Sequence, residues 1–174
     1  TNKKINTVKI SNVASKDSVA VIYDKNKSLR STNAGVVGSS SIALGDEATT
    51  GRLSIALGDK TKATGEDATA IGYQAEATAL DSIAIGGNAK STGGDSIAIG
   101  NDTNATSLYS VAIGDDIHFT GNLATAVGQQ AHATGDYSTA LGAMTNVDDD
   151  YKASHTDWRK SGVQSTTIGY HSGS

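Results

Sequence analysis

A tripeptide of alanine, an aliphatic residue and glycine recurs at a nearly constant interval through most of the chain. The interval is 13 residues once and 14 residues six times. This period is too short for a pair of helices and too regular for a globular core, so each unit is predicted to be one turn of a solenoid. The glycines, expected at turns with positive φ, are Gly45, Gly58, Gly72, Gly86, Gly100, Gly114, Gly128 and Gly142.

The residues before each glycine have the period of a β-strand, as in Ser82-Ile83-Ala84-Ile85-Gly86. The second and fourth side chains share one face, and the alanine points to the other. Because both faces are apolar, both are expected to be buried. The aliphatic side chains are predicted to fill the coil and the alanines to approach a threefold axis, although the opposite assignment is also open. The alanine column is Ala43, Ala56, Ala70, Ala84, Ala98, Ala112, Ala126 and Ala140.

A second small residue follows six of the glycines after seven positions, at Gly65, Ala79, Gly93, Ser107, Gly121 and Gly135, which predicts two strands and two turns in each period. The middle column of the second strand is expected to face water and to alternate in charge along the stack. In that column His118 and His132 lie on adjacent coils, and we expect a solvated pair because two ligands do not make a metal site. The column is Lys62, Glu76, Lys90, Asn104, His118 and His132.

Composition supports a thin, all-β rod. The 174 residues include no Cys, no Pro, one Trp and one Phe, so the interior must be narrow and disulfides are excluded. No apolar run approaches the length of a membrane span, and the chain is expected to be an excised segment. Seven basic and two acidic side chains lie in residues 1–33, whereas residues 34–144 carry four basic and twelve acidic ones. The shaft is therefore acidic and the N-terminal end basic.

An isolated coil of this kind would expose a long apolar stripe to water. Stripes of that size mark interfaces, and a closed homo-oligomer about a threefold axis would bury the stripe against its own copies. The sequence therefore predicts a homotrimer.

The repeat resembles the NSVAIG-type repeat of the YadA-like head domains of bacterial trimeric autotransporter adhesins. The resemblance covers residues 34–144 and again 165–170, where Ser165-Thr166-Thr167-Ile168-Gly169 adds one more turn glycine. It implies a left-handed parallel β-roll with 14-residue coils, three chains side by side and display on the surface of a Gram-negative bacterium. Membrane anchoring is expected only through C-terminal neck, stalk and barrel regions outside this sequence.

The repeat divides the chain into four parts. Residues 1–33 are predicted to be atypical distal coils or a cap, and residues 34–144 the regular roll. Residues 145–164 are predicted to form an inserted loop, because Gly142 and Gly169 are 27 positions apart. Residues 165–174 would form a final coil that leads toward a neck.

The inserted loop holds Tyr151, His155, Trp158 and Arg159, residue types that are enriched at binding hot spots. A second interpretation is that Trp158 folds back to cover the roll or a neighbouring chain. The three consecutive aspartates at 148–150 lack the spacing and glycine of a calcium loop. Neither a metal nor a cofactor is expected, and a nucleic-acid partner is not expected either.

The sequence predicts no enzyme, because it places no catalytic triad, metal-binding helix or phosphate loop on a recognisable scaffold. From the resemblance, we expect attachment to host extracellular matrix proteins such as collagen, fibronectin or laminin, or to an epithelial receptor such as a CEACAM. The alternative is a structural spacer in the adhesin fibre, or a module for self-association into aggregates or biofilm, with no host ligand of its own.

Overall fold

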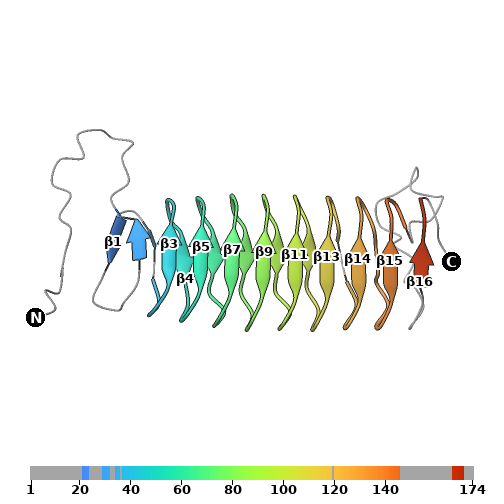
Figure 1. Ribbon diagram of the computed structural model, residues 1–174, viewed down its shortest axis with the longest axis horizontal. Coiled ribbons are helices and arrows are strands. Elements are labelled where there is room, and N and C mark those ends of the chain that lie inside the picture. The colour runs from blue at the N-terminus through green and yellow to red at the C-terminus, as the bar shows by residue number, and fades with distance from the viewer. Residues whose placement is uncertain are drawn as a thin grey trace, which may run out of the picture.

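The chain forms a rod in which short strands are stacked side by side along the long axis (Figure 1). The computed structural model describes residues 21–23, 29–31, 34–35, 37–118, 120–145 and 166–170. Within them every regular element is a strand, and all strand pairs but one are parallel. The fold is therefore an all-β parallel solenoid, as the repeat predicts.

The larger of its two sheets has eleven strands in the order β1-β2-β3-β5-β7-β9-β11-β13-β14-β15-β16. Equivalent residues of successive repeats pair with each other, so that Ala98 of β11 lies beside Ala84 and Ala112. The strands are β1 (Val21–Tyr23), β2 (Leu29–Ser31), β3 (Ile42–Leu44), β5 (Ile55–Leu57), β7 (Thr69–Ile71), β9 (Ile83–Ile85), β11 (Ile97–Ile99), β13 (Val111–Ile113), β14 (Thr125–Val127), β15 (Thr139–Leu141) and β16 (Thr166–Ile168).

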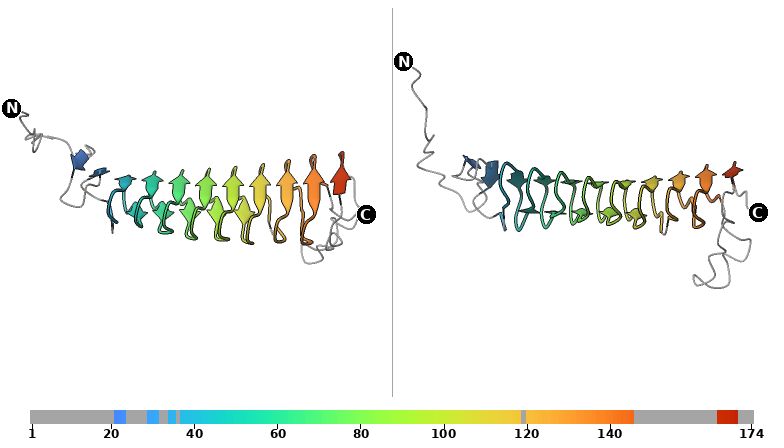
Figure 2. Two further views of the ribbon diagram at one scale, coloured as in Figure 1. Left: turned by 60° about the horizontal axis from the view of Figure 1, so that its bottom comes forward. Right: turned by 90° about the horizontal axis from the view of Figure 1, so that it is seen from below.

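The smaller sheet has five strands and runs as a second row along the rod (Figure 2). Each of its strands comes from the second half of a repeat, which confirms the predicted division into two strands and two turns. It ends at β12, and in the next coil the fully buried Ile117 takes a place that smaller residues such as Ala89 and Thr103 hold elsewhere. The strands are β4 (Thr49–Thr50), β6 (Lys62–Ala63), β8 (Glu76–Ala77), β10 (Lys90–Ser91) and β12 (Asn104–Ala105).

The alanine column lines the interior of the coil, so the predicted assignment of the two faces is wrong. All eight alanines, from Ala43 to Ala140, have no exposed surface in the single chain. Small side chains such as Ala77 and Ala105 of the smaller sheet are fully buried as well. Two sheets joined by such short turns leave room between them only for side chains of about this size, so the larger aliphatic residues are directed outward.

The outward side chains of the larger sheet form two parallel columns, which we call the aliphatic face. Most of them are half-buried in the single chain, and Ile113 is exposed. The aliphatic face consists of Ile42, Leu44, Ile55, Leu57, Ile71, Ile83, Ile85, Ile97, Ile99, Val111, Ile113, Val127 and Leu141.

Serines just before the strands of the larger sheet close the second turn of the coil. Their side chains are buried, and each hydroxyl donates to the carbonyl three residues earlier. In Ser82 and Ser96, for example, the distances to the carbonyls of Ala79 and Gly93 are 2.7 and 2.6 Å. A small hydroxyl therefore gives a carbonyl of the turn a hydrogen-bond partner.

The turn glycines have φ between 117° at Gly142 and 156° at Gly114, a region that glycine tolerates and other residues avoid. Two positions after each glycine of the main repeat, a residue of another type adopts the left-handed conformation, as Asn88 does with φ of 55°. The second turn repeats this pattern, for example at Asp95 with φ of 53°. Both turns of the described coils therefore contain a left-handed residue other than glycine, whereas the sequence predicted positive φ only at the turn glycines.

The two ends of the larger sheet differ. At the N-terminal end β1 and β2 form the single antiparallel pair among the described strands, and β2 then pairs in parallel with β3. At the C-terminal end β16 pairs in parallel with β15, which places Thr167 beside Ala140 in the interior column.

Candidate functional site

The outer face of the smaller sheet carries a polar column that is open to solvent, as predicted for most of its members. Lys62 donates from Nζ to Glu76 Oε1 over 2.8 Å, which joins two successive coils by an ion pair. Lys90 and then Asn104 and His118 continue the column. An exposed pair of this kind contributes at most about 1 kcal/mol, so it adds little to the stability of the roll.

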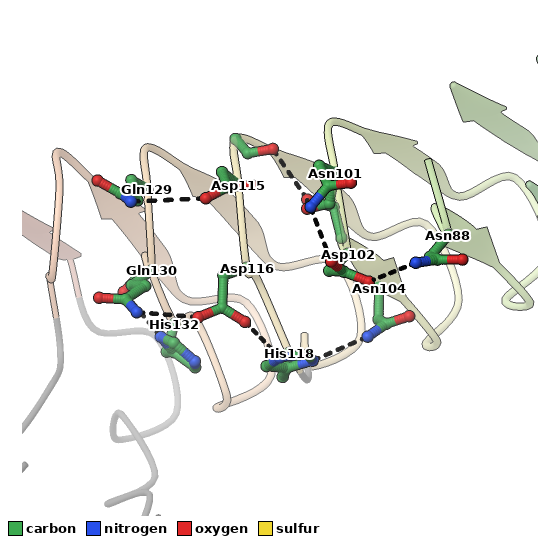
Figure 3. Close-up of polar contacts among 12 residues, drawn as sticks. Asn88, Asn101, Asp102, Asn104, Asp115, Asp116, His118, Gln129, Gln130 and His132 are labelled. Atoms are coloured by element: carbon green, nitrogen blue, oxygen red, sulfur yellow. Dashed lines mark hydrogen bonds and ion pairs between the residues drawn. The ribbon is translucent and has the colours of Figure 1, made fainter. Parts of the chain in front are cut away.

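A second column, two residues after each turn glycine, is polar from Glu47 to Gln130, and two pairs of its side chains are hydrogen-bonded between successive coils. Asn88 Nδ2 donates to Asp102 Oδ1 over 2.9 Å, and Gln130 Nε2 donates to Asp116 Oδ2 over 2.9 Å (Figure 3). Between the two columns lies a groove of about 550 Å³ that extends from Glu47 to His118. The groove presents ammonium, carboxylate and amide groups on rigid backbone, a surface suited to an extended polar ligand.

Asp116, His118 and Asn104 form a chain of hydrogen bonds at the C-terminal end of this groove (Figure 3). His118 Nε2 lies 2.6 Å from Asp116 Oδ1, and Asn104 Nδ2 lies 2.9 Å from His118 Nδ1. Because a carboxylate only accepts and an amide nitrogen only donates, the neutral ring carries its proton on Nε2. The hydrogen bond from Gln130, with a smaller contribution from His118, lowers the pKa of Asp116.

His132 departs from the predicted solvated pair. Its side chain is 1% exposed, and Nδ1 lies 2.8 Å from the backbone oxygen of Gln130. Burial lowers its pKa, since removing the ring from water disfavours the charged form. The two histidines therefore occupy unlike environments, and in the described part of the chain no group of three or more His, Cys, Asp or Glu is placed to hold a metal ion.

The burial of His132 predicts a loss of stability in mild acid. Its pKa is lower in the folded state, so the unfolded chain binds the proton first as the pH falls below about 6.5. The contribution of neutral His132 to the free energy of unfolding is fully present above that pH, and it is lost as the pH falls toward the pKa of the folded state. We expect the difference in melting temperature between pH 7.5 and pH 5.5 to be smaller in His132→Gln than in the original chain. An unchanged difference would contradict this role, and Asp116 does not interfere because its pKa lies below that range.

The residues singled out in the inserted loop, Tyr151, His155, Trp158 and Arg159, lie outside the described residues. Their role as ligand contacts stays a prediction. The alanines and glycines of the repeat form the interior and the turns of the scaffold, and they leave the functional chemistry to other columns.

One surface feature was missed by the sequence analysis. Four exposed residues gather at the second turn of three successive coils, and we call them the tyrosine ledge: Leu108, Tyr109, Leu123 and Tyr137. The signal was present in the aligned repeats. One column reads Leu53, Asp67, Asp81 and Asp95 and then changes to Tyr109, Leu123 and Tyr137 on three successive coils.

These features define a class of protein, a repetitive parallel β-solenoid whose coils supply a scaffold and whose outer columns supply surfaces for contact. A family model described as the YadA head domain repeat matches residues 50–75, 63–89, 77–103, 91–116 and 120–143. Because these matches span more than half of the sequence, the chain belongs to the YadA head family. A search among curated proteins finds no match.

The family identifies the chain as a head of the trimeric autotransporter adhesin type, exposed on the bacterial surface. Domains of this family are typically non-enzymatic. Heads of this family form homotrimers and bind host targets. Among the described residues no helix is long and apolar enough to cross a membrane.

Proposed function

We propose that this chain is the left-handed, 14-residue-coil β-roll of a homotrimeric adhesin head that attaches a Gram-negative bacterium to host tissue. The observation that carries the proposal is the aliphatic face. Its columns extend along the larger sheet from β3 to β15 and leave a continuous row of partly exposed isoleucines, leucines and valines in the single chain. Soluble monomers rarely leave apolar surface of that extent uncovered.

A threefold arrangement covers the aliphatic face with copies of itself. The face lies on one side of a straight sheet, so three rods with parallel axes would direct their faces toward one axis. The acidic groups and the groove of the smaller sheet would then remain on the outside. This arrangement differs from the sequence prediction, because the aliphatic side chains rather than the alanines would meet at the axis.

The trimer is tested by placing a charge on the aliphatic face. Ile97 lies in the middle of the face and is half-buried in the single chain, so Ile97→Asp would bury three carboxylates near the axis. We expect sedimentation at micromolar concentration to show trimers for the original chain and monomers for this variant. Leu80→Asp is the control, because Leu80 is 54% exposed at a turn, and it should remain trimeric. A monodisperse original monomer would refute the proposal.

The proposed ligands are extracellular matrix proteins such as collagen, fibronectin or laminin, or an epithelial receptor such as a CEACAM. We also propose that the inserted residues 145–164 interrupt the roll between residues 34–144 and the final coil, and that Tyr151, His155, Trp158 and Arg159 contact the ligand. Support comes from the residue types, which suit binding hot spots, and from β16, which pairs with β15 after the insertion.

Binding of the trimer to immobilised matrix proteins and receptors tests this proposal. We expect binding to at least one of them and a loss of that binding when residues 145–162 are deleted. A matched variant, Lys60→Gln with Lys90→Gln, alters the groove and leaves the insertion intact. If the deletion left binding unchanged and the groove variant lost it, the ligand-binding site would lie in the groove and not in the insertion. Failure to bind any ligand would favour a spacer or self-association module.

A further inference from the structure

The tyrosine ledge is an exposed apolar surface that the repeat itself does not require. Tyr109, Leu123 and Tyr137 are 56%, 49% and 56% exposed, and Leu108 beside them is 53% exposed. Backbone bonds join the coils that carry them, with Leu123 N donating to Leu108 O and Tyr137 N donating to Asn122 O, each over 2.9 Å. Equivalent residues of neighbouring coils lie about 4.8 Å apart, so the side chains form one continuous strip.

Bulky residues are unfavourable at these positions for a second reason. Tyr109, Leu123 and Tyr137 have φ of 55°, 52° and 59°, in the left-handed region. Asn, Asp and Gly tolerate that region best, and three preceding coils place aspartate there. Compared with aspartate, tyrosine and leucine at these positions have a less favourable backbone conformation and expose apolar surface to water. Leu53 is a single bulky residue in this column, with φ of 58°, whereas the ledge places three on successive coils. A run of residues held against local preference at an exposed surface indicates selection for contact.

The charge around the ledge restricts what it contacts. Residues 91–145 contain five aspartates and neither lysine nor arginine. Asp95 is exposed on the coil before Tyr109, and Asp136 precedes Tyr137 in the chain. Asn122 fixes the Asp136 carboxylate, since its backbone N and its Nδ2 donate to Asp136 Oδ1 over 2.9 and 3.2 Å. Carboxylates beside exposed tyrosine rings form a surface complementary to cations that also bring apolar groups.

We propose that the tyrosine ledge is a docking surface for a basic polypeptide segment. Lysine or arginine side chains of the partner stack on the rings of Tyr109 and Tyr137, and its apolar side chains contact Leu108 and Leu123. Asp95 and Asp136 supply the opposite charge. The ledge lies on turns and the aliphatic face on strands, so docking here goes beyond the proposed attachment function and does not depend on residues 145–164.

The test replaces the three ledge residues by the aspartate that other coils carry in the same column. Tyr109→Asp, Leu123→Asp and Tyr137→Asp are combined in the full chain, and the fold should tolerate them because Asp67, Asp81 and Asp95 adopt the same φ region. The probe is a fluorescent peptide of alternating arginine and leucine. We expect its affinity to fall by roughly five- to thirtyfold, the effect of losing two exposed ring contacts.

The direction of the change separates ring contact from simple charge attraction. The triple variant is more acidic, so a peptide held by charge alone would bind it more tightly, and that result would overturn the proposal. Tyr73→Asp is the control, because Tyr73 is also 56% exposed but lies at the first turn, and its affinity should equal that of the original chain.

Two further readouts keep the test independent of the proposed function. Dissociation of the triple variant into monomers in sedimentation would overturn the proposal, because the ledge would then be an interface between copies. Binding of an uncharged oligosaccharide with the same dependence on the ledge would also overturn it, since the partner would then be a neutral glycan. A trimeric variant that loses only the basic peptide supports it.

Discussion

Gly86→Ala is expected to destabilise the roll strongly, although it adds only one methyl group. Gly86 has φ of 132°, and a Cβ built on it would overlap the backbone carbonyl of Gly100 in the next coil. The disfavoured backbone region alone costs about 1–3 kcal/mol. Relief of the overlap would also require the next coil to move, and that coil is itself stacked against Gly114. We expect a loss of more than about 3 kcal/mol in the free energy of unfolding, measured by denaturant titration.

The neighbouring glycine provides the control. A Cβ at Gly87 would meet the Oδ1 atom of the Asn101 side chain at 3.0 Å, and that exposed side chain is able to turn away. Gly87→Ala should therefore change the free energy of unfolding by less than about 1 kcal/mol. Similar losses for the two variants would show that the stacked carbonyl does not constrain the turn.

Ala98→Leu is expected to have the second largest effect. Ala98 is fully buried between Ala84 and Ala112 in the larger sheet, and the interior is filled by methyl and hydroxymethyl groups from both sheets. Three additional carbon atoms cannot be placed without separating the sheets. Overpacking of this kind typically costs about 1–3 kcal/mol in each chain, and we expect Ala98→Leu to lie at the upper end of this range because the interior is thin. Thermal unfolding of the assembled protein measures this loss of stability.

The outward neighbour distinguishes the interior from the aliphatic face. Ile97→Leu changes the shape of a half-buried side chain and conserves its volume, so it should cost less than about 1.5 kcal/mol. If Ala98→Leu instead left the stability of the chain unchanged and only weakened association, the alanine column would lie at the interface, which is the arrangement that the sequence predicts.

The sequence does not tell which face of the strands points into the coil. Alternation in Ser96-Ile97-Ala98-Ile99 separates the aliphatic residues from alanine but does not say which set points inward. The answer depends on the distance between the two sheets, and that distance is set by the turns. The left-handed residues of the turns, such as Asn88 and Asp95, were not recognisable by type, because Leu123 and Tyr137 occupy equivalent positions.

Only some of the candidate sites could be predicted, because the strand period gives the face of a side chain but not its burial or its backbone conformation. The polar column from Lys62 to His118 followed directly from the period of the second strand, and the Lys62 to Glu76 ion pair was predicted by its alternating charge. His132 belongs to the same column yet is buried, which the period of the strand did not predict. The tyrosine ledge required knowledge of backbone conformation, since its exposure and its strain appear only once φ is known.

The sequence by itself determined that this chain is a parallel β-solenoid with two turns in each repeat, and with a second strand in the coils as far as β12, because identical units that stack must repeat their contacts. It also determined the turn glycines and the acidic character of the shaft. Only the tertiary structure decided that alanines fill the coil and that the aliphatic face points outward. The physical reason is the narrow space between the two sheets, which admits small side chains and directs the larger ones to the surface, where assembly and binding occur.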